Sequence, residues 1–156
     1  MPLSVGMTIN AGATLTLDNT SSSTVIDRLA DSLALTMNGG NFNFIGSSFA
    51  SMDESAGALT SGIATQSGNN IITITPGSGG STTMQFASLS RTAGSSLLFR
   101  GTSFGSTPAA NVSTLLFSGG VTLVGGSGLE NSTTISIIAG AIGDNSLTGT
   151  GTDMVT

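Results

Sequence analysis

The feature that most constrains the fold of this chain is the recurrence of short β-prone apolar runs between Gly, Ser, Asn and Asp residues. Many of these runs alternate apolar and hydroxyl side chains, as residues 13–17 and 71–75 do. A period of two places the apolar side chains on one face of a strand and the hydroxyls on the other. Turn-forming residues end each run after a few positions. The pattern predicts an all-β chain with one short helical turn near residues 24–31, where the apolar spacing is helical.

Internal similarity indicates that these strands belong to a solenoid. Residues 95–101 match residues 113–119 at five of seven positions, including the run Leu-Leu-Phe. A spacing of roughly 20 residues is typical of coils built from about three short strands. One such coil cannot bury its own apolar face, whereas stacked coils form a continuous inner column. We therefore predict a single β-solenoid segment over residues 1–156, a parallel β-helix with coils of about 20 residues.

An antiparallel sandwich is the alternative architecture, because its strands also recur, roughly every 8–12 residues. Sandwiches usually carry Asn-Gly or Asp-Gly hairpin turns and a large buried aromatic residue. Asn38-Gly39 is the one dipeptide of that kind in the sequence, and Trp and Tyr are absent. These observations favour the solenoid.

The alternation also predicts which side chains point into the solenoid as stacked ladders. The predicted inward residues are Leu15, Leu17, Leu35, Met37, Phe42, Phe44, Ile72, Ile74, Phe86, Leu97, Phe99, Leu115, Phe117, Leu123, Ile135 and Ile137. Neither end of the sequence offers a helix or a run of charges that would cap such a column. We therefore expect copies to associate through their ends, and head-to-tail stacking would give filaments.

Composition argues against an enzyme. The chain has no Cys, His, Lys, Trp or Tyr and only three basic residues, Arg28, Arg91 and Arg100. His, Cys and Lys supply most of the acid–base and nucleophilic groups that work near neutral pH. The residues also indicate no cofactor site and no metal site. A net charge of −5 without a basic stripe argues against nucleic acid as a partner, and no apolar stretch suggests membrane insertion.

The acidic residues offer two candidate sites, and the simpler interpretation is favoured for each. Asp53-Glu54 is the one adjacent acidic pair, but neighbouring strand residues point to opposite faces, which predicts two solvated turn charges instead of a catalytic pair. Residues 143–149 are similar to a calcium-binding β-roll nonapeptide. They form a single imperfect copy with Asp144 one position early, which predicts an ordinary turn.

Charged residues outside those sites are interpreted as local contacts. Asp27, Arg28 and Asp31 have helical spacing, which predicts an ion pair that caps a turn instead of a recognition patch. Arg91 and Arg100 lie near strand ends, where we expect them to donate hydrogen bonds to turn carbonyls.

Two further patterns have ordinary explanations. The pairs Thr14/Thr16 and Thr73/Thr75 are too sporadic for an ice-binding lattice and predict ordinary outward strand residues. Three sequons, which begin at Asn19, Asn111 and Asn131, fit the N-glycosylation pattern. Chance explains them in a chain this rich in Asn, Ser and Thr.

The order of several motifs resembles the autotransporter-associated β-strand repeat. The resemblance covers about residues 11–105. Its motifs are residues 14–19, 27–31, 35–44, 57–60, 70–76, 86–91 and 99–102. The resemblance implies a right-handed parallel β-helix from a long secreted or surface-anchored bacterial protein, and it carries no catalytic residues.

From these observations we expect a structural or adhesive extracellular β-solenoid segment, a fragment of a longer chain, that is not an enzyme. Surface glycans or other cells are the expected partners, besides further copies of the chain. The alternative is a carbohydrate-binding or carbohydrate-active β-helix fragment with an acidic groove.

Overall fold

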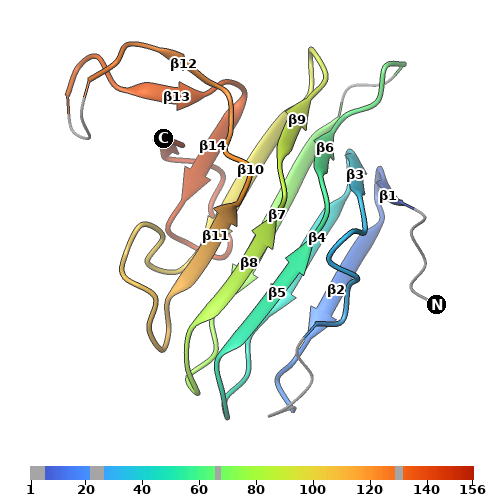
Figure 1. The fold of residues 1–156 in the computed structure, drawn as a ribbon, viewed down its shortest axis with the longest axis vertical. Helices are drawn as coiled ribbons and strands as arrows, with labels where there is room; N and C mark the ends of the chain where they lie inside the picture. The colour runs from blue at the N-terminus through green and yellow to red at the C-terminus, as the bar shows by residue number, and fades with distance from the viewer. Residues whose placement is uncertain (1–5, 22–26, 66–67, 129–131) are drawn as a thin grey trace.

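The computed structural model describes residues 6–21, 27–65, 68–128 and 132–156. The chain is all-β and winds as a parallel β-solenoid of about three turns, as the sequence predicts. Successive coils lie side by side along one axis, from the blue N-terminal strands to the orange C-terminal ones (Figure 1). The right-handed winding that the resemblance implies stays a prediction.

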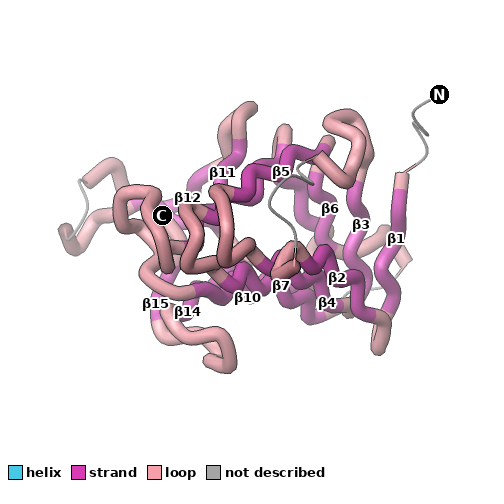
Figure 2. Tube along the Cα trace, turned by 90° about the horizontal axis from the view of Figure 1, so that it is seen from below, coloured by secondary structure: helices cyan, strands magenta, loops and turns pink. Residues whose placement is uncertain are grey.

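Three sheets form the wall of the solenoid, and each complete coil contributes one strand to each sheet in turn. The first sheet consists of β1 (Met7–Asn10), β3 (Leu35–Asn38), β6 (Leu59–Ser61) and β9 (Leu89–Arg91). The second sheet contains β2 (Thr14–Asp18), β4 (Asn41–Ile45), β7 (Asn69–Thr75) and β10 (Ser96–Gly101), followed by β14 (Ala141–Asp144) and β15 (Asp153–Met154). The third sheet consists of β5 (Met52–Ala56), β8 (Thr82–Phe86) and β11 (Ser113–Phe117). β5 and β11 face the strands of the second sheet across the interior (Figure 2).

The coils are longer than the sequence repeat predicts. Leu35 lies opposite Leu59 in the first sheet, and Thr82 lies opposite Ser113 in the third, so each step to the next coil exceeds the predicted spacing. The similarity between residues 95–101 and 113–119 relates β10 to β11, which are successive strands of one coil in two different sheets. Each strand meets the same packing demand, so neighbouring strands resemble one another and imitate a shorter repeat.

The interior is a column of apolar side chains stacked from coil to coil. Most predicted inward residues are buried: Leu17, Leu35, Met37, Phe42, Phe44, Ile72, Ile74, Phe86, Leu97 and Phe99. Leu15, Leu115 and Phe117 are partly buried and pack against this core. The rings of Phe42 and Phe117 flank Phe86, with centroids 6.3 and 6.1 Å from its own. These distances lie in the range of favourable aromatic pairs.

The corner between the first and second sheets contains a left-handed glycine in every coil, although the length of the connection differs. Gly39 occupies it with φ of 84°, in the left-handed region that residues with a Cβ rarely adopt. Its counterparts in the other coils are Gly12, Gly62 and Gly94, all with φ near that value. Beneath this corner the buried Asn70 accepts a hydrogen bond from the Gly39 N–H and donates one to Ser61. The corner therefore combines a tight backbone turn with a satisfied polar ladder.

The regular coil ends after β11, and the predicted core is wrong there. β12 (Leu123–Gly125) and β13 (Ser136–Ile138) pair as an antiparallel hairpin beside the coils (Figure 1). Leu123 is 45% exposed on this hairpin, Ile135 and Ile137 are half-buried, and Ile138 enters the core instead. β14 then returns to the second sheet, and β15 pairs with it antiparallel. β15 is then the outermost described strand of the second sheet, and the expectation of an uncapped C-terminal end stays a prediction.

The short helical turn predicted near residues 24–31 is also absent from the described part of that segment. Residues 24–26 lie outside the described residues, and residues 27–31 form a non-helical loop that tertiary contacts hold in place. The described part of the chain has no helix of the length and apolarity that a membrane crossing needs.

The stacked rings provide the first testable prediction. Phe86→Ala removes a fully buried ring from the middle of the aromatic column, so we expect the free energy of unfolding to fall by about 3–5 kcal/mol in urea melts. Phe49→Ala is the matched control, because Phe49 is 66% exposed, and its effect should stay within about 0.5 kcal/mol. Equal losses in the two variants would contradict the inward ladder.

Candidate functional site

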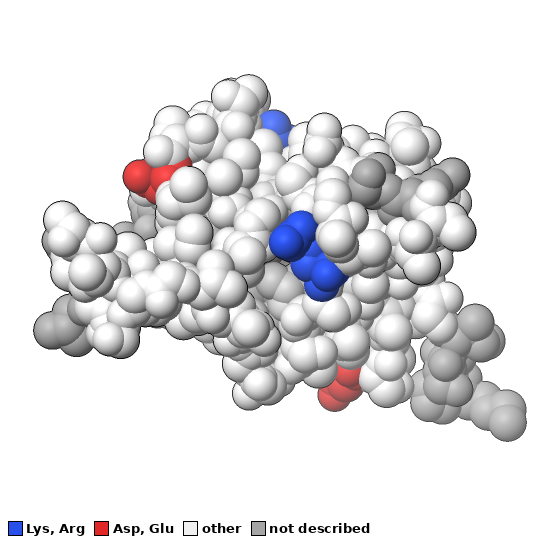
Figure 3. All heavy atoms as spheres, turned by 90° about the horizontal axis from the view of Figure 1, so that it is seen from above, with Lys and Arg blue, Asp and Glu red and all other residues white. Residues whose placement is uncertain are grey.

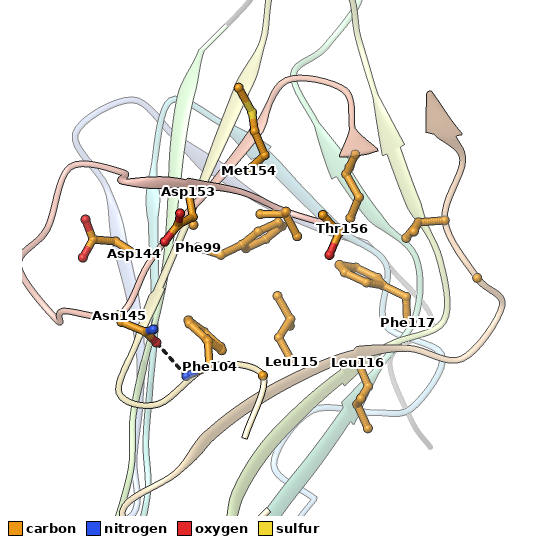
Figure 4. A pocket seen from close by; sticks show the side chains of 16 residues that line it. Phe99, Phe104, Leu115, Leu116, Phe117, Asp144, Asn145, Asp153, Met154 and Thr156 are labelled. Atoms are coloured by element: carbon orange, nitrogen blue, oxygen red, sulfur yellow. Dashed lines mark hydrogen bonds between the residues drawn. The ribbon is translucent and has the colours of Figure 1, made fainter. Parts of the chain in front are cut away.

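A hollow lies at the C-terminal end of the solenoid. It has a volume of about 550 Å³ and is bounded by β11 on one side and by β14 and β15 on the other. The rings of Phe99, Phe104 and Phe117 contribute to its wall (Figure 4). Because Phe99 and Phe117 also belong to the interior column, this cavity is the open end of the apolar lumen.

Polar groups occur along one side of this cavity. Asp144, Asn145 and Asp153 line it, and the Asn145 side-chain oxygen accepts a hydrogen bond of 2.8 Å from the Phe104 N–H (Figure 4). Among the described residues, no group of three or more acidic, His or Cys side chains lies close enough to hold a metal ion. The residues that line the cavity thus offer an apolar surface with a polar rim, which suits binding, and they supply no nucleophile paired with a base.

The segment compared with a β-roll nonapeptide forms a turn around Asp144. The two carboxylate oxygens of Asp144 accept hydrogen bonds from the N–H groups of Ser146, at 2.9 Å, and Gly151, at 3.0 Å. Gly149 lies so close that a Cβ there would clash with the Asp144 carboxylate. Backbone donors therefore occupy both oxygens, as the prediction of an ordinary turn requires.

The acidic pair Asp53-Glu54 is split by the strand, as predicted, but the prediction of two solvated charges is wrong for Glu54. Asp53 points outward from β5, whereas Glu54 points into the solenoid and is only 2% exposed. Its carboxylate accepts hydrogen bonds from the N–H groups of Arg28, at 2.8 Å, and Leu29, at 2.7 Å. Burial is the main cause that raises the pKa of Glu54. It outweighs the lowering effect of these two donors, and the negative charges of Asp27 and Asp31 add to it.

Asp27, Arg28 and Asp31 lie in the described part of the chain, and the expected ion pair does not form among them. The segment that carries them is not helical. The helical spacing fails because the loop takes its shape from Glu54 and from Asp27, whose φ is 62°. Arg91 meets the expectation of a turn contact, since it donates to the carbonyls of Thr92 and Ser95. Arg100 donates to the Gly149 carbonyl and also to the Thr73 hydroxyl.

The predicted threonine pairs form no regular array. Thr14 and Thr16 are exposed on β2, but Thr73 is buried on β7, where it accepts hydrogen bonds from Arg100. Asn19, the first sequon residue, is buried, which is consistent with a chance match, and Asn131 lies outside the described residues.

A more regular row of hydroxyls occurs on the first sheet, and sequence reasoning missed it. Thr8, Thr36 and Thr60 stand opposite one another on β1, β3 and β6, and Ser90 continues the row on β9. Ser90 donates a hydrogen bond of 3.2 Å to Thr60. Neighbouring strands lie about 4.8 Å apart, so the row repeats at that interval along the axis. The signal was one outward hydroxyl per coil, which becomes visible only once the coil length is known.

Charge is sparse on the surface. The face seen in Figure 3 is almost entirely white, with a few blue and red groups that are separated from one another. This face has no basic stripe of the kind that binds a nucleic-acid backbone.

Comparison with known proteins gives one partial similarity. The chain is 39% identical over 89 residues to the adhesin BmaC autotransporter of Brucella suis biovar 1 (strain 1330). The matched region covers 56% of this chain and 2% of that much longer relative. No protein-family model and no solved structure matches the chain.

The Asp144 turn gives the second testable prediction. Asp144→Asn replaces one accepting oxygen by an amide that cannot accept, so one of the two part-buried hydrogen bonds to this charged group is lost. We expect the free energy of unfolding to fall by about 1–3 kcal/mol in urea melts. Asp153→Asn removes an exposed charge on β15 and should change it by no more than about 0.5 kcal/mol. An unchanged stability in Asp144→Asn would mean that the carboxylate does not hold this turn.

Proposed function

We propose that this chain is a structural and adhesive segment of a long bacterial surface protein of the autotransporter type, without catalytic activity. The observation that carries the proposal is the partial similarity to an autotransporter adhesin in a chain that folds as a β-solenoid. The sparse charge and the absence of His, Lys and Cys support a role in binding instead of chemistry. We also propose that the chain is extracellular and that residues 1–156 form a single solenoid segment. The same proposal includes membership of the autotransporter-associated β-strand repeat family that the sequence resembles.

The solenoid architecture supports an adhesive role physically. Stacked coils hold outward side chains at fixed intervals, so many weak contacts act together on a large partner surface. The hydroxyl row of Thr8, Thr36, Thr60 and Ser90 favours a glycan as that partner, because hydroxyls both donate and accept hydrogen bonds. This row is also the observation that supports the alternative function, a carbohydrate-binding β-helix fragment.

The adhesive role is tested with beads that carry the whole chain, measured for attachment to cultured cells and to a glycan array. We expect retention above uncoated beads and no cleavage of the bound polysaccharide. Replacing Thr8, Thr36 and Thr60 by Val removes three hydroxyls and keeps the strand shape, so it should reduce glycan binding several-fold. The matched control, Thr14→Val with Thr16→Val, changes exposed hydroxyls on another sheet. No attachment to any surface would contradict adhesion, and glycan cleavage would contradict the non-enzymatic role.

We also propose that copies associate through the ends of the solenoid. The open cavity at the C-terminal end supports this proposal, as do the exposed rim residues Leu116 and Met154. β9 and β11 are the last described strands of the first and third sheets, so one edge of each has no further described strand beside it. Unpaired strand edges next to apolar surface favour pairing with another chain.

Light scattering at increasing protein concentration tests the association. We expect the mass to rise with concentration, and the double variant Leu116→Asp with Met154→Asp to lower the association constant at least tenfold. Phe49→Asp places the same charge on an exposed apolar position away from that end and should change little. A filament in electron micrographs requires both ends to take part, whereas a closed dimer involves one end. A monomer at all concentrations would disprove end-to-end association.

A further inference from the structure

Glu54 breaks the apolar pattern of the column in which it lies. It stands opposite Met84 on β8, and Met84 stands opposite Leu115 on β11, so the two equivalent inward positions are apolar. Met52 and Ala56, its inward neighbours on β5, are buried and apolar as well. Burial of an acidic side chain at this position costs free energy unless the side chain is hydrogen-bonded. Its presence in an apolar column therefore needs a structural reason.

The reason lies in the loop that crosses the N-terminal side of β5. Residues 27–34, which we call the cap, place the buried Leu29 and Leu33 against the core. The Gly57 N–H donates to the Leu33 carbonyl at 2.9 Å, and a Cβ on Gly57 would meet the Ser32 carbonyl oxygen at 2.8 Å. The cap therefore lies directly against β5, at the position where the first coil has no described strand of the third sheet.

The backbone of the cap is shaped to receive a carboxylate. The left-handed conformation of Asp27 directs the consecutive N–H groups of Arg28 and Leu29 to the two oxygens of Glu54. Such paired N–H groups form an anion-binding concavity. Here the bound anion belongs to the chain itself, and the contact joins positions 25 and 26 residues apart.

The charged groups around this contact oppose an ionised Glu54. Asp27 and Asp31 of the cap are acidic, Asp53 precedes Glu54 on β5, and Arg28 contributes its backbone N–H to the contact. Met84, which faces Glu54 from β8, is uncharged. Among the described residues, the groups that act on the pKa of Glu54 include no cationic side chain, so no positive charge offsets the burial of this carboxylate.

We propose that residues 27–34 are a proton-sensitive cap over the β5 edge of the lumen, and that the Glu54 carboxyl group is its latch. When the cap opens, water reaches the carboxyl group and its pKa returns towards the ordinary value of 4.5. Because the closed form has the higher pKa, it binds a proton more tightly than the open form. Protonation weakens the contact of one oxygen with its N–H group, but it also removes the buried negative charge, and burial is the larger of these two effects. Acid therefore favours the closed cap, and opening increases as the pH rises from 4.5 to the pKa of the closed form.

This cap has a consequence for the sheet edge that it covers. β5 is the first described strand of the parallel third sheet, and an uncovered first strand is a template for pairing with another chain. A cap that loosens with rising pH would expose this edge under neutral conditions and cover it under acidic ones. The inference concerns the cap alone and does not depend on the adhesive role.

Hydrogen exchange tests the latch in the intact chain. Exchange of the Arg28 and Leu29 amides is followed from about pH 4 to about pH 8 and divided by the intrinsic rate at each pH. We expect protection of the cap to fall about tenfold for each unit by which the closed-state pKa of Glu54 exceeds that of the open state. The amides of Ile72 and Ile74 in β7 report global unfolding and should keep their protection.

Variants separate the latch from a general effect of pH. Glu54→Gln cannot titrate, so the protection of its cap should not depend on pH. Asp27→Asn with Asp31→Asn removes the like charges and should reduce the loss of protection at neutral pH. Asp53→Asn, which removes an outward charge from the same strand, is the control and should behave as the unmodified chain does.

Three results would overturn the proposal. The first is protection of the cap that stays constant over this range of pH in the unmodified chain. The second is protection of the cap that falls in step with that of β7. The third is equal pH dependence in the unmodified chain and in Glu54→Gln. The first two results come from the unmodified chain alone, so they decide the question even where Glu54→Gln does not fold.

Discussion

In-register parallel pairing between coils is the constraint on which the rest of this structure depends. A single coil of three short strands has an apolar interior that is open above and below, so it gains burial only from its neighbours. Leu35 is buried between Met7 and Leu59, and Ile72 is buried between Phe42 and Phe99. The same register places the corner glycines in line along the axis. A shift of one strand by one residue would turn its inward side chains outward, so the register is strongly specified.

Departures from that register occur at the two ends of the column, and the most unusual contacts of the chain lie there. At the N-terminal side the first coil has no described strand of the third sheet, and the cap with its Glu54 contact occupies the position instead. At the C-terminal side the hairpin of β12 and β13 leaves the coil and β15 reverses direction. A loop consequently completes the wall of the first coil, and the lumen is open as a cavity at the C-terminal end.

The outer faces explain how a chain with so few reactive groups can still serve in recognition. Outward positions carry Thr, Ser and Asn on the first two sheets, and the three arginines are spread along the chain. Arg91 and Arg100 are engaged with turn carbonyls or hydroxyls of the chain itself. Binding by such a surface relies on repeated neutral hydrogen bonds, which suits an extended glycan or another protein surface better than a small charged ligand.

The sequence by itself determined which side chains face inward along most of the coils, because alternation with a period of two is a local property of a strand. It therefore predicted the solenoid, the buried Phe42 and Ile72, and the opposite orientation of Asp53 and Glu54. It misjudged the coil length, since successive strands such as β10 and β11 resemble one another as closely as equivalent ones do. It also misjudged the core beyond β11, where pairing changes from parallel to antiparallel.

Only the tertiary structure decided the environment of the candidate sites. The donors that hold Glu54 are backbone groups of the cap, which is distant from β5 in the sequence, so no local pattern reveals them. The hydroxyl row on the first sheet and the cavity beside Phe117 likewise join residues from several coils. Alternation fixes the direction of a side chain, whereas the partner that it meets depends on the register between coils, which is set by the packing of the whole column.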